Sequence, residues 1–465
     1  MRRLVPLLLL LTAGCVYYNG MYNARHFEKD ARRAEQDGRT LDASSLWGQA
    51  SVKAESVYTK HPRSRWAEEA RVIHATAMQR LGDCPGALRT IEPVPASTRD
   101  PRVLEEASFV IGRCREVLGD PLGASQAFEK VIGSRDPARR REALYYHGRA
   151  LRLDGHYDEA LEELRRTSYP PAQGERGAAL AGLGRTGEAL AIVDSLIARR
   201  DSAAPFEAII RDIGTHDPAA ATALVDRLVA LPSWSPGLKA QWLITDGLRA
   251  APESPEIARQ RLTDAERLAP RYPAGDEARL ALIQLSIRSV GEEAALEEVA
   301  SRLEELRDRG GASSAEAIRL LALIRAIQNA TQAATPGATE GDMHLFLAAE
   351  FSRDSLEAPK LSVNLLRRML DGWPDSPYAP KAVLALRQLQ PSDSALDWTA
   401  LSQRYAGSPY LAVLRGEDPP GYRALEDSLL VFTIRRYEVN GRPGATSPAT
   451  APGGAKPGAR RPIEQ

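Results

Sequence analysis

The chain has little of what usually announces a binding preference. Its 61 Lys and Arg residues are matched by 61 Asp and Glu residues, so the full chain carries no net charge at neutral pH. Such a balance gives no reason to expect nucleic acid or an acidic membrane surface as a partner. Aromatic residues make up only 6% of the chain, whereas Ala, Leu, Arg and Glu recur throughout. This composition favours helix over sheet.

Catalytic and metal-binding motifs are also missing. The sequence contains no His-Glu-x-x-His, no Gly-x-Ser-x-Gly and no glycine-rich phosphate loop. Acidic pairs such as Glu162 and Glu163 lie in amphipathic helices rich in Lys and Arg, where they form solvated faces. We therefore expect no catalytic residues, metal or cofactor, and neither a nucleic acid nor a small-molecule substrate. The histidines, which have no metal-ligand spacing, are His26, His61, His74, His147, His156, His216 and His344.

No apolar run after residue 15 is long enough to cross a membrane, but a shorter one precedes it. Residues 4–14 are apolar or small, follow Arg2 and Arg3, and have the length of a secretory signal core. They end in Leu-Thr-Ala-Gly-Cys15, which resembles the lipobox of bacterial lipoproteins. The resemblance implies a signal peptide at 1–14, cleavage before Cys15, and acyl chains on Cys15 that hold the protein to a lipid bilayer. The alternative is an ordinary cleaved signal with Cys15 as an incidental residue.

The lipobox resemblance also implies a location. A lipoprotein of this kind lies outside the cytoplasm, and Val16 stands where an inner-membrane retention signal commonly has Asp. We therefore expect the protein on the periplasmic side of the outer membrane. Loss of Arg2 and Arg3 with the signal would leave the mature chain with a charge of about −2.

A repeated quartet of residues is the strongest pattern in the sequence. It consists of a small residue, a glycine, an alanine and a large apolar residue at successive offsets of 7, 5 and 4 positions. We expect the small residue to let a second helix approach closely, and the glycine to end the first helix in a left-handed conformation. The five quartets are Ala31-Gly38-Ala43-Trp47, Ala75-Gly82-Ala87-Ile91, Gly112-Gly119-Ala124-Phe128, Gly148-Gly155-Ala160-Leu164 and Gly177-Gly184-Ala189-Val193.

This pattern resembles the tetratricopeptide repeat, a helical hairpin whose ideal period is 34 residues. The resemblance implies an all-α fold, a superhelix of stacked hairpins (an α-solenoid), which the uneven glycine spacing makes irregular in the middle. A generic helical bundle is the alternative. We divide the chain into a signal peptide (1–14), an N-terminal array (15–200), a degenerate hairpin region (201–327), a linker (328–341), C-terminal hairpins (342–438) and a disordered tail (439–465).

Cys84 and Cys114 fall on helices that should pack antiparallel, the first at a helix start and the second near a helix end. An oxidising envelope would then allow a disulfide between them. The alternative is that Cys114 is a small core residue on an apolar stripe and that Cys84 is a free thiol. The sequence leaves both open.

A tetratricopeptide-like array presents a groove lined by the first helix of each hairpin. Arginines beside aromatic residues in such a groove suit an extended or acidic peptide, although the arginines equally fit ordinary solvated positions. The residues expected to face the groove are Arg80, Phe109, Arg113, Tyr145, Arg149 and Arg152.

The lipobox, the repeats and segments such as His61-Pro-Arg-Ser and Trp373-Pro-Asp-Ser-Pro-Tyr resemble outer-membrane tetratricopeptide lipoproteins. The closest resemblance is to the lipoprotein of the β-barrel assembly machine and to the periplasmic Tol–Pal coordinator. It implies a non-enzymatic scaffold that binds envelope proteins, including outer-membrane barrels or their assembly factors. An alternative is the helical part of a lytic transglycosylase-related system without its catalytic domain. A small-ligand-binding lipoprotein is disfavoured because no alternating strand pattern is present.

Overall fold

The computed structural model describes residues 20–335, 337–338, 340–391 and 396–440. These residues form helices and connecting loops with no strand among them. The chain divides into two compact units, Met1–Trp234 and Ser235–Gln465, each of which is described by itself. Cys15 and the signal peptide lie outside the described residues.

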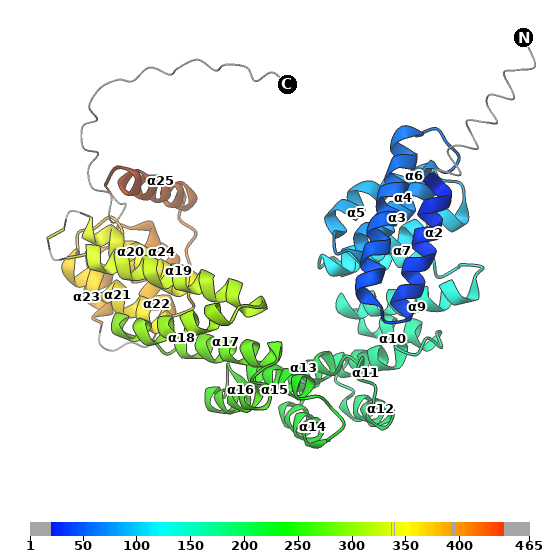
Figure 1. The fold of residues 1–465 in the computed structure, drawn as a ribbon. Helices are drawn as coiled ribbons and strands as arrows, with labels where there is room; N and C mark the ends of the chain where they lie inside the picture. The colour runs from blue at the N-terminus through cyan, green and yellow to red at the C-terminus, as the bar shows by residue number, and fades with distance from the viewer. Residues whose placement is uncertain (1–19, 336, 339, 392–395, 441–465) are drawn as a thin grey trace, which may run out of the picture. The chain divides into compact units, whose positions relative to one another are not determined.

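The described helices of unit 1 follow one another as antiparallel hairpins (Figure 1). We call the two members of a hairpin its first and second helix; the pairs are α2/α3, α4/α5, α7/α8, α9/α10, α11/α12 and α13/α14. Their bounds are α2 Tyr22–Gln36, α3 Thr40–Lys60, α4 Ala67–Arg80, α5 Cys84–Ile91, α6 Val94–Ser97, α7 Pro101–Val117, α8 Pro121–Glu129, α9 Pro137–Leu153, α10 Tyr157–Arg165, α11 Ala172–Gly182, α12 Thr186–Ala198, α13 Phe206–His216 and α14 Pro218–Ala230.

Unit 2 continues with helices that pack mainly on their neighbours in the chain. They are α15 Pro236–Ala250, α16 Pro255–Leu268, α17 Pro273–Ile287, η2 Glu293–Ala295, α18 Leu296–Arg309, α19 Ala312–Ala333, α20 Gly341–Glu350, η3 Phe351–Ser355, α21 Pro359–Gly372, α22 Ala379–Leu389, α23 Trp398–Arg404, α24 Pro409–Leu414 and α25 Tyr422–Asn440. The expected all-α fold of stacked hairpins is therefore confirmed.

The quartets do in the structure what their residue types predict. The five turn glycines Gly38, Gly82, Gly119, Gly155 and Gly184 all have a left-handed backbone, with φ between 70° and 89°. L-residues with a Cβ rarely adopt this conformation, and it ends the first helix of each hairpin.

In the third and fourth quartets the small position packs directly against the large apolar position. A Cβ added to Gly112 would lie 2.6 Å from Phe128 Cζ, and one added to Gly148 would lie 2.6 Å from Leu164 Cγ. Phe128 and Leu164 are fully buried. Glycine at these two positions is therefore what allows the two helices of the hairpin to approach so closely.

Two boundaries differ from those expected from the sequence. The boundary between the two units falls between Trp234 and Ser235 in the sequence, whereas the expected array ended at residue 200. The segment 328–341, expected as a linker, is helical as far as Ala333, because Ile327, Ala330 and Thr331 of α19 are buried. Of the expected tail, residues 439 and 440 belong to α25, and the rest lies outside the described residues.

Candidate protein-binding groove

A groove of about 670 Å³ lies on the first helices of four successive hairpins of unit 1, α2, α4, α7 and α9. Nineteen residues line it, and these helices supply nearly all of them. The arrangement agrees with the expectation that first helices line the groove of such an array. The basic lining residues are Arg25, Lys29, Arg32, Arg33, Arg80, Arg113 and Arg139, and the acidic ones are Glu28, Glu106, Asp136 and Glu142.

Helix α2 contributes one side of this groove through its polar face. Ala24, Ala31 and Ala34 are buried against the rest of the unit. Side chains three or four positions apart share a helix face, so the residues from Arg25 to Gln36 that line the groove form one continuous surface.

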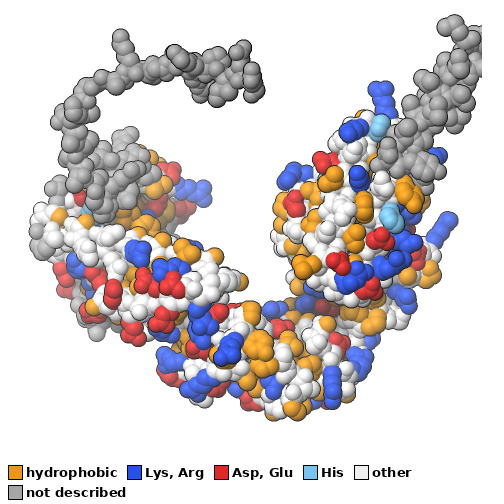
Figure 2. All heavy atoms as spheres, in the orientation of Figure 1, with side chains coloured by type: hydrophobic (Ala, Val, Ile, Leu, Met, Phe, Trp, Pro, Cys, Tyr) orange, Lys and Arg blue, Asp and Glu red, His pale blue; other side chains and the backbone are white. Residues whose placement is uncertain are grey.

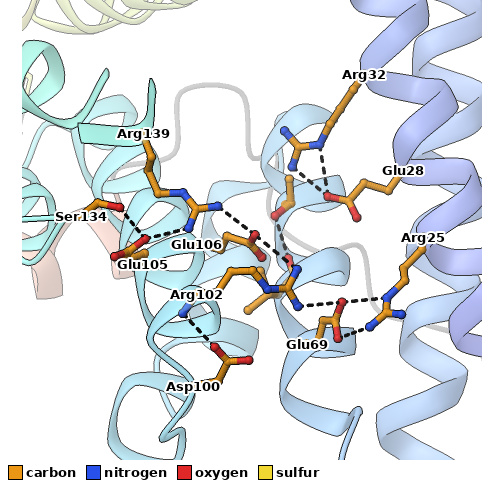
Figure 3. A network of polar contacts seen from close by, with 12 residues as sticks. Arg25, Glu28, Arg32, Glu69, Asp100, Arg102, Glu105, Glu106, Ser134 and Arg139 are labelled. Carbon is orange, nitrogen blue, oxygen red and sulfur yellow. Dashed lines mark hydrogen bonds and ion pairs between the residues drawn. The ribbon is translucent and has the colours of Figure 1, made fainter. Parts of the chain in front are cut away.

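Glu69 of α4 is the centre of a polar network that includes the groove residue Arg25 (Figure 3). Its carboxylate accepts two hydrogen bonds from the Arg25 guanidinium, at 2.8 and 2.5 Å, and lies 3.3 Å from Arg102 Nη2. Glu69 is buried, so two arginines compensate its charge where water cannot. This network joins α2, α4 and α7, three of the helices that line the groove.

A second ion-pair cluster joins α7 to α9 (Figure 3). Arg139 Nη1 donates to Glu105 at 2.7 Å and Nη2 donates to Glu106 at 3.2 Å, while the Ser134 hydroxyl donates to Glu105 at 2.9 Å. Burial raises the pKa of Glu106, and the guanidinium groups of Arg102 and Arg139 act in the opposite direction. Arg139 is therefore already paired with carboxylates of this chain.

Aromatic side chains form a corner of the groove beside this cluster. Phe109 packs edge-on against Phe128 and Tyr146, with ring centroids 5.7 and 6.1 Å apart. The Arg113 guanidinium lies 4.4 Å from the Tyr146 ring centroid and takes part in no ion pair of the described residues. A stacked guanidinium keeps its N–H groups, which lie in its plane, available for a carboxylate or carbonyl of a partner.

Three of the six residues expected in the groove line it, and three do not. Arg80, Phe109 and Arg113 belong to the lining. Tyr145, Arg149 and Arg152 lie outside it, in contacts between neighbouring hairpins.

The three residues outside the groove belong to a largely buried network around Glu175 of α11. Arg152 Nε donates to Glu175 at 2.6 Å, and both side chains are only 5% exposed. Arg149 lies 3.1 Å from Glu116 and donates to the Tyr145 hydroxyl at 3.4 Å. Removing one member of a buried ion pair typically costs about 3–5 kcal/mol, so this network stabilises the packing of α9 on its neighbours.

Several groove residues escaped the sequence prediction. Lys29 and Arg33 of α2 and Gln79 of α4 line the groove, and Tyr146 carries the stacked Arg113. The polar face of α2, opposite its buried alanines, is the signal that would have found the first two.

Cys84 and Cys114 form a disulfide in the structure, with their Cα atoms 5.0 Å apart. It joins the start of α5 to the end of α7, as the antiparallel packing of these helices predicts. Both cysteines are buried in one apolar cluster, next to the groove-lining residues Val72 and Val110.

Within the described ranges there is no group of three or more His, Cys, Asp and Glu side chains placed to hold a metal ion. Within those ranges, too, no helix combines the length and apolarity needed to cross a membrane.

Comparison with known proteins finds similar solved structures but no matching protein-family model or curated protein sequence. Among solved structures, the chain is similar to a tetratricopeptide repeat protein from Parabacteroides merdae, at 15% identity over 57% of this chain and 99% of that one, with a TM-score of 0.39. It is also similar to the Naa15/Naa10 complex bound to HypK-THB, at 13% identity over 92% of this chain and 63% of that one, with a TM-score of 0.25. Neither likeness is close enough to bear on function.

Proposed function

We propose that the protein is a scaffold that binds another protein, and that the groove of unit 1 holds an extended segment of that partner. The observation that carries the proposal is the groove itself, which is open to solvent, spans four hairpins and mixes charged with aromatic side chains. Aromatic and arginine side chains dominate the energetics of protein interfaces.

The charges that remain unpaired favour an acidic partner segment. Arg25, Arg32 and Arg139 are occupied by carboxylates of this chain. Lys29 and Arg113 take part in no ion pair of the described residues. These two cations face the groove, so carboxylates of a bound segment would meet them without competition.

The proposal also includes acylation of Cys15 and a location on the periplasmic face of the outer membrane. They are supported by the resemblance of Leu11–Cys15 to a lipobox. Envelope proteins are then the partner class, and the resemblance to the barrel-assembly lipoprotein favours outer-membrane barrels or their assembly factors among them. No observation favours a role in peptidoglycan processing.

Site-specific photocrosslinking in cells tests the groove. A photoreactive amino acid at Gln79 lies in the groove, whereas one at Val52 lies on the second helix α3, where that side chain is 64% exposed. We expect a partner adduct from position 79 and none from position 52. The adduct should weaken severalfold when Lys29→Ala and Arg113→Ala are combined.

Equal adducts from positions 79 and 52 would contradict a groove-bound partner. Mass spectrometry of the adduct then decides the partner class. Recovery of a barrel or barrel-assembly factor supports that role, and recovery of Tol-type or peptidoglycan-associated proteins rejects it.

A further inference from the structure

The two ends of the hairpins in unit 1 carry opposite charge. Consecutive antiparallel helices place every connection between hairpins at one edge, which we call the connection edge, and every turn within a hairpin at the other, the turn edge. The connection segments 60–66, 92–100, 130–136, 165–171 and 199–205 contain ten Lys and Arg but four Asp and Glu. The turn segments 37–42, 81–85, 118–122, 153–159 and 183–188 contain two Lys and Arg but eight Asp and Glu. The zero net charge of the chain hides this separation.

Helix ends account for part of the charge at both edges, since Lys60 and Arg165 lie in last helical turns, where the helix dipole favours a cation. Asp83 and Asp120 accept hydrogen bonds from helix N-terminal amides at the turn edge. At the connection edge, Arg63, Arg65 and Arg99 lie in loops, beyond the last turn of the preceding helix, where the helix dipole gives them no role.

Four basic side chains of the first two connection segments have no counter-ion in the described part of the chain. Lys60, Arg63, Arg65 and Arg99 are exposed, and none of them takes part in an ion pair among the described residues. The groove arginine Arg25, by contrast, is held by Glu69. Figure 2 shows Lys and Arg side chains at the edge of unit 1 near α6. Four exposed cations without counter-ions are available to an external anionic surface.

The chain enters unit 1 at this same edge. A Cβ added to Gly20 would meet Val57 Cγ2, three residues before the end of α3. Met21 is fully buried in a cluster with Val57, and Trp66 of the following loop packs against that cluster. Gly20 is five residues from Cys15, and five extended residues span at most about 18 Å. An acyl anchor at Cys15 therefore keeps the connection edge close to the bilayer.

We propose that the connection edge around Lys60, Arg63, Arg65 and Arg99 lies against anionic phospholipid headgroups of the membrane that anchors Cys15. The inference rests on the proposed acylation for its geometry, and on the unpaired charges for its chemistry. Basic residues are attracted to anionic bilayers within a Debye length of the surface, about 10 Å at moderate salt. A basic surface beside an acyl chain supplies a second membrane signal and fixes the orientation of the unit. The acidic turn edge then points away from the bilayer.

Vesicle binding of the full-length mature chain carrying Cys15→Ser isolates the electrostatic contribution, because no acyl chain is present. We expect co-sedimentation with phosphatidylcholine vesicles that contain about 40 mol% phosphatidylglycerol, and none with phosphatidylcholine alone. Raising NaCl from about 0.05 to 0.5 M should release the protein. Arg63→Gln combined with Arg65→Gln should weaken binding roughly tenfold.

The matched control is Arg267→Gln combined with Arg271→Gln, which removes the same charge from the last turn of α16 and the loop that follows it in unit 2. We expect this pair to bind vesicles like the parent chain. Equal binding by both double variants, or equal binding to the two kinds of vesicle, would overturn the proposal.

A second measurement uses the acylated protein in vesicles of the same two compositions. Trypsin should cleave after Arg63, Arg65 and Arg99 more slowly on anionic vesicles, with cleavage after Arg39 at the turn edge unchanged. Mass spectrometry of the N-terminal peptide reports acylation separately, and the Gln79 crosslink reports the groove. A failure of either is therefore distinguishable from a failure of the lipid surface.

Discussion

The two units are built from similar helices but have differently organised cores. In unit 1 the buried apolar residues form separate clusters, for example around Trp47, around Cys84 and around Phe128. In unit 2 one cluster runs from Ile283 to Leu411 and takes in residues of α17 to α24. Unit 1 is thus held by several small clusters, each shared by neighbouring hairpins, and unit 2 largely by one cluster.

Ion pairs join consecutive hairpins in both units; in unit 2 the examples include Arg279–Glu266 and Lys381–Glu350. In unit 1 the examples include Arg25–Glu69, Arg139–Glu105 and Arg152–Glu175. In unit 1 such pairs place charged side chains between hairpins, and the candidate groove is found there.

The largest expected effect comes from truncating a core leucine in each unit. Leu164→Ala in unit 1 and Leu303→Ala in unit 2 should each cost up to about 5 kcal/mol, because both side chains are fully buried. The difference should lie in how far the damage spreads. Hydrogen exchange should accelerate in α9 to α11 for Leu164→Ala, but from residue 283 to 411 for Leu303→Ala. Faster exchange throughout unit 1 in the Leu164 variant would contradict a segmented core.

Next in size is loss of the disulfide, which only unit 1 has. The Cys84–Cys114 bridge closes a loop with a sequence separation of 30, worth about 3–4 kcal/mol in the chain-entropy model. Cys84→Ala combined with Cys114→Ala should lower the free energy of unfolding of unit 1 by that amount. Urea unfolding measures this loss. Hydrogen exchange should show that the protection of amides in unit 2 is unchanged. Two free thiols in non-reduced peptides of the parent protein would contradict the bond itself.

The sequence predicted unit 1 better than unit 2 because the turn glycine made its hairpins visible. Hairpin α15/α16 keeps the same close packing, since a Cβ on Gly247 would lie 3.1 Å from Leu262 Cγ and 3.3 Å from the Ala258 carbonyl oxygen. Its turn has Ser254 with φ of −138° where a quartet would have a left-handed glycine. A search anchored on glycine therefore passes over this hairpin.

Only three of the six residues expected in the groove line it, and the reason differs from that for the missed hairpin. Phe109 and Tyr145 stand three residues before the small positions Gly112 and Gly148, and Arg113 and Arg149 stand one residue after them. Equal register predicts equal roles, yet only Phe109 and Arg113 line the groove. Carboxylates on the neighbouring helices decide the outcome, because Glu116 and Glu175 lie beside Arg149. Such partners across helices are invisible to spacing within one helix.

A smaller effect should follow from adding one methyl group at the small positions. Gly148→Ala should cost about 1–3 kcal/mol, because its Cβ meets Leu164 and the Ala160 backbone. Gly247→Ala in unit 2 should cost less, since its nearest contact is 3.1 Å away. Gly48→Ala is the control: it faces open space in α3 and should gain up to about 1 kcal/mol from helix propensity. Urea unfolding of the three variants checks this order, and a neutral Gly148→Ala would contradict the tight approach.

The smallest effect should be a pH dependence confined to unit 1. Burial lowers the pKa of His147 on α9, and the nearby Glu163 carboxylate opposes this only in part. The unfolded chain therefore binds a proton below pH about 6.5 more readily than the folded one, so stability falls as the pH falls through that value. Between pH 7.5 and 5.5 the loss should be at most about 1 kcal/mol, and His147→Gln should remove it. Urea unfolding at the two pH values, with hydrogen exchange in α9 and α10, measures both. If His147→Gln keeps the full pH dependence, the buried imidazole is not its source, and another titrating group must be sought outside this hairpin.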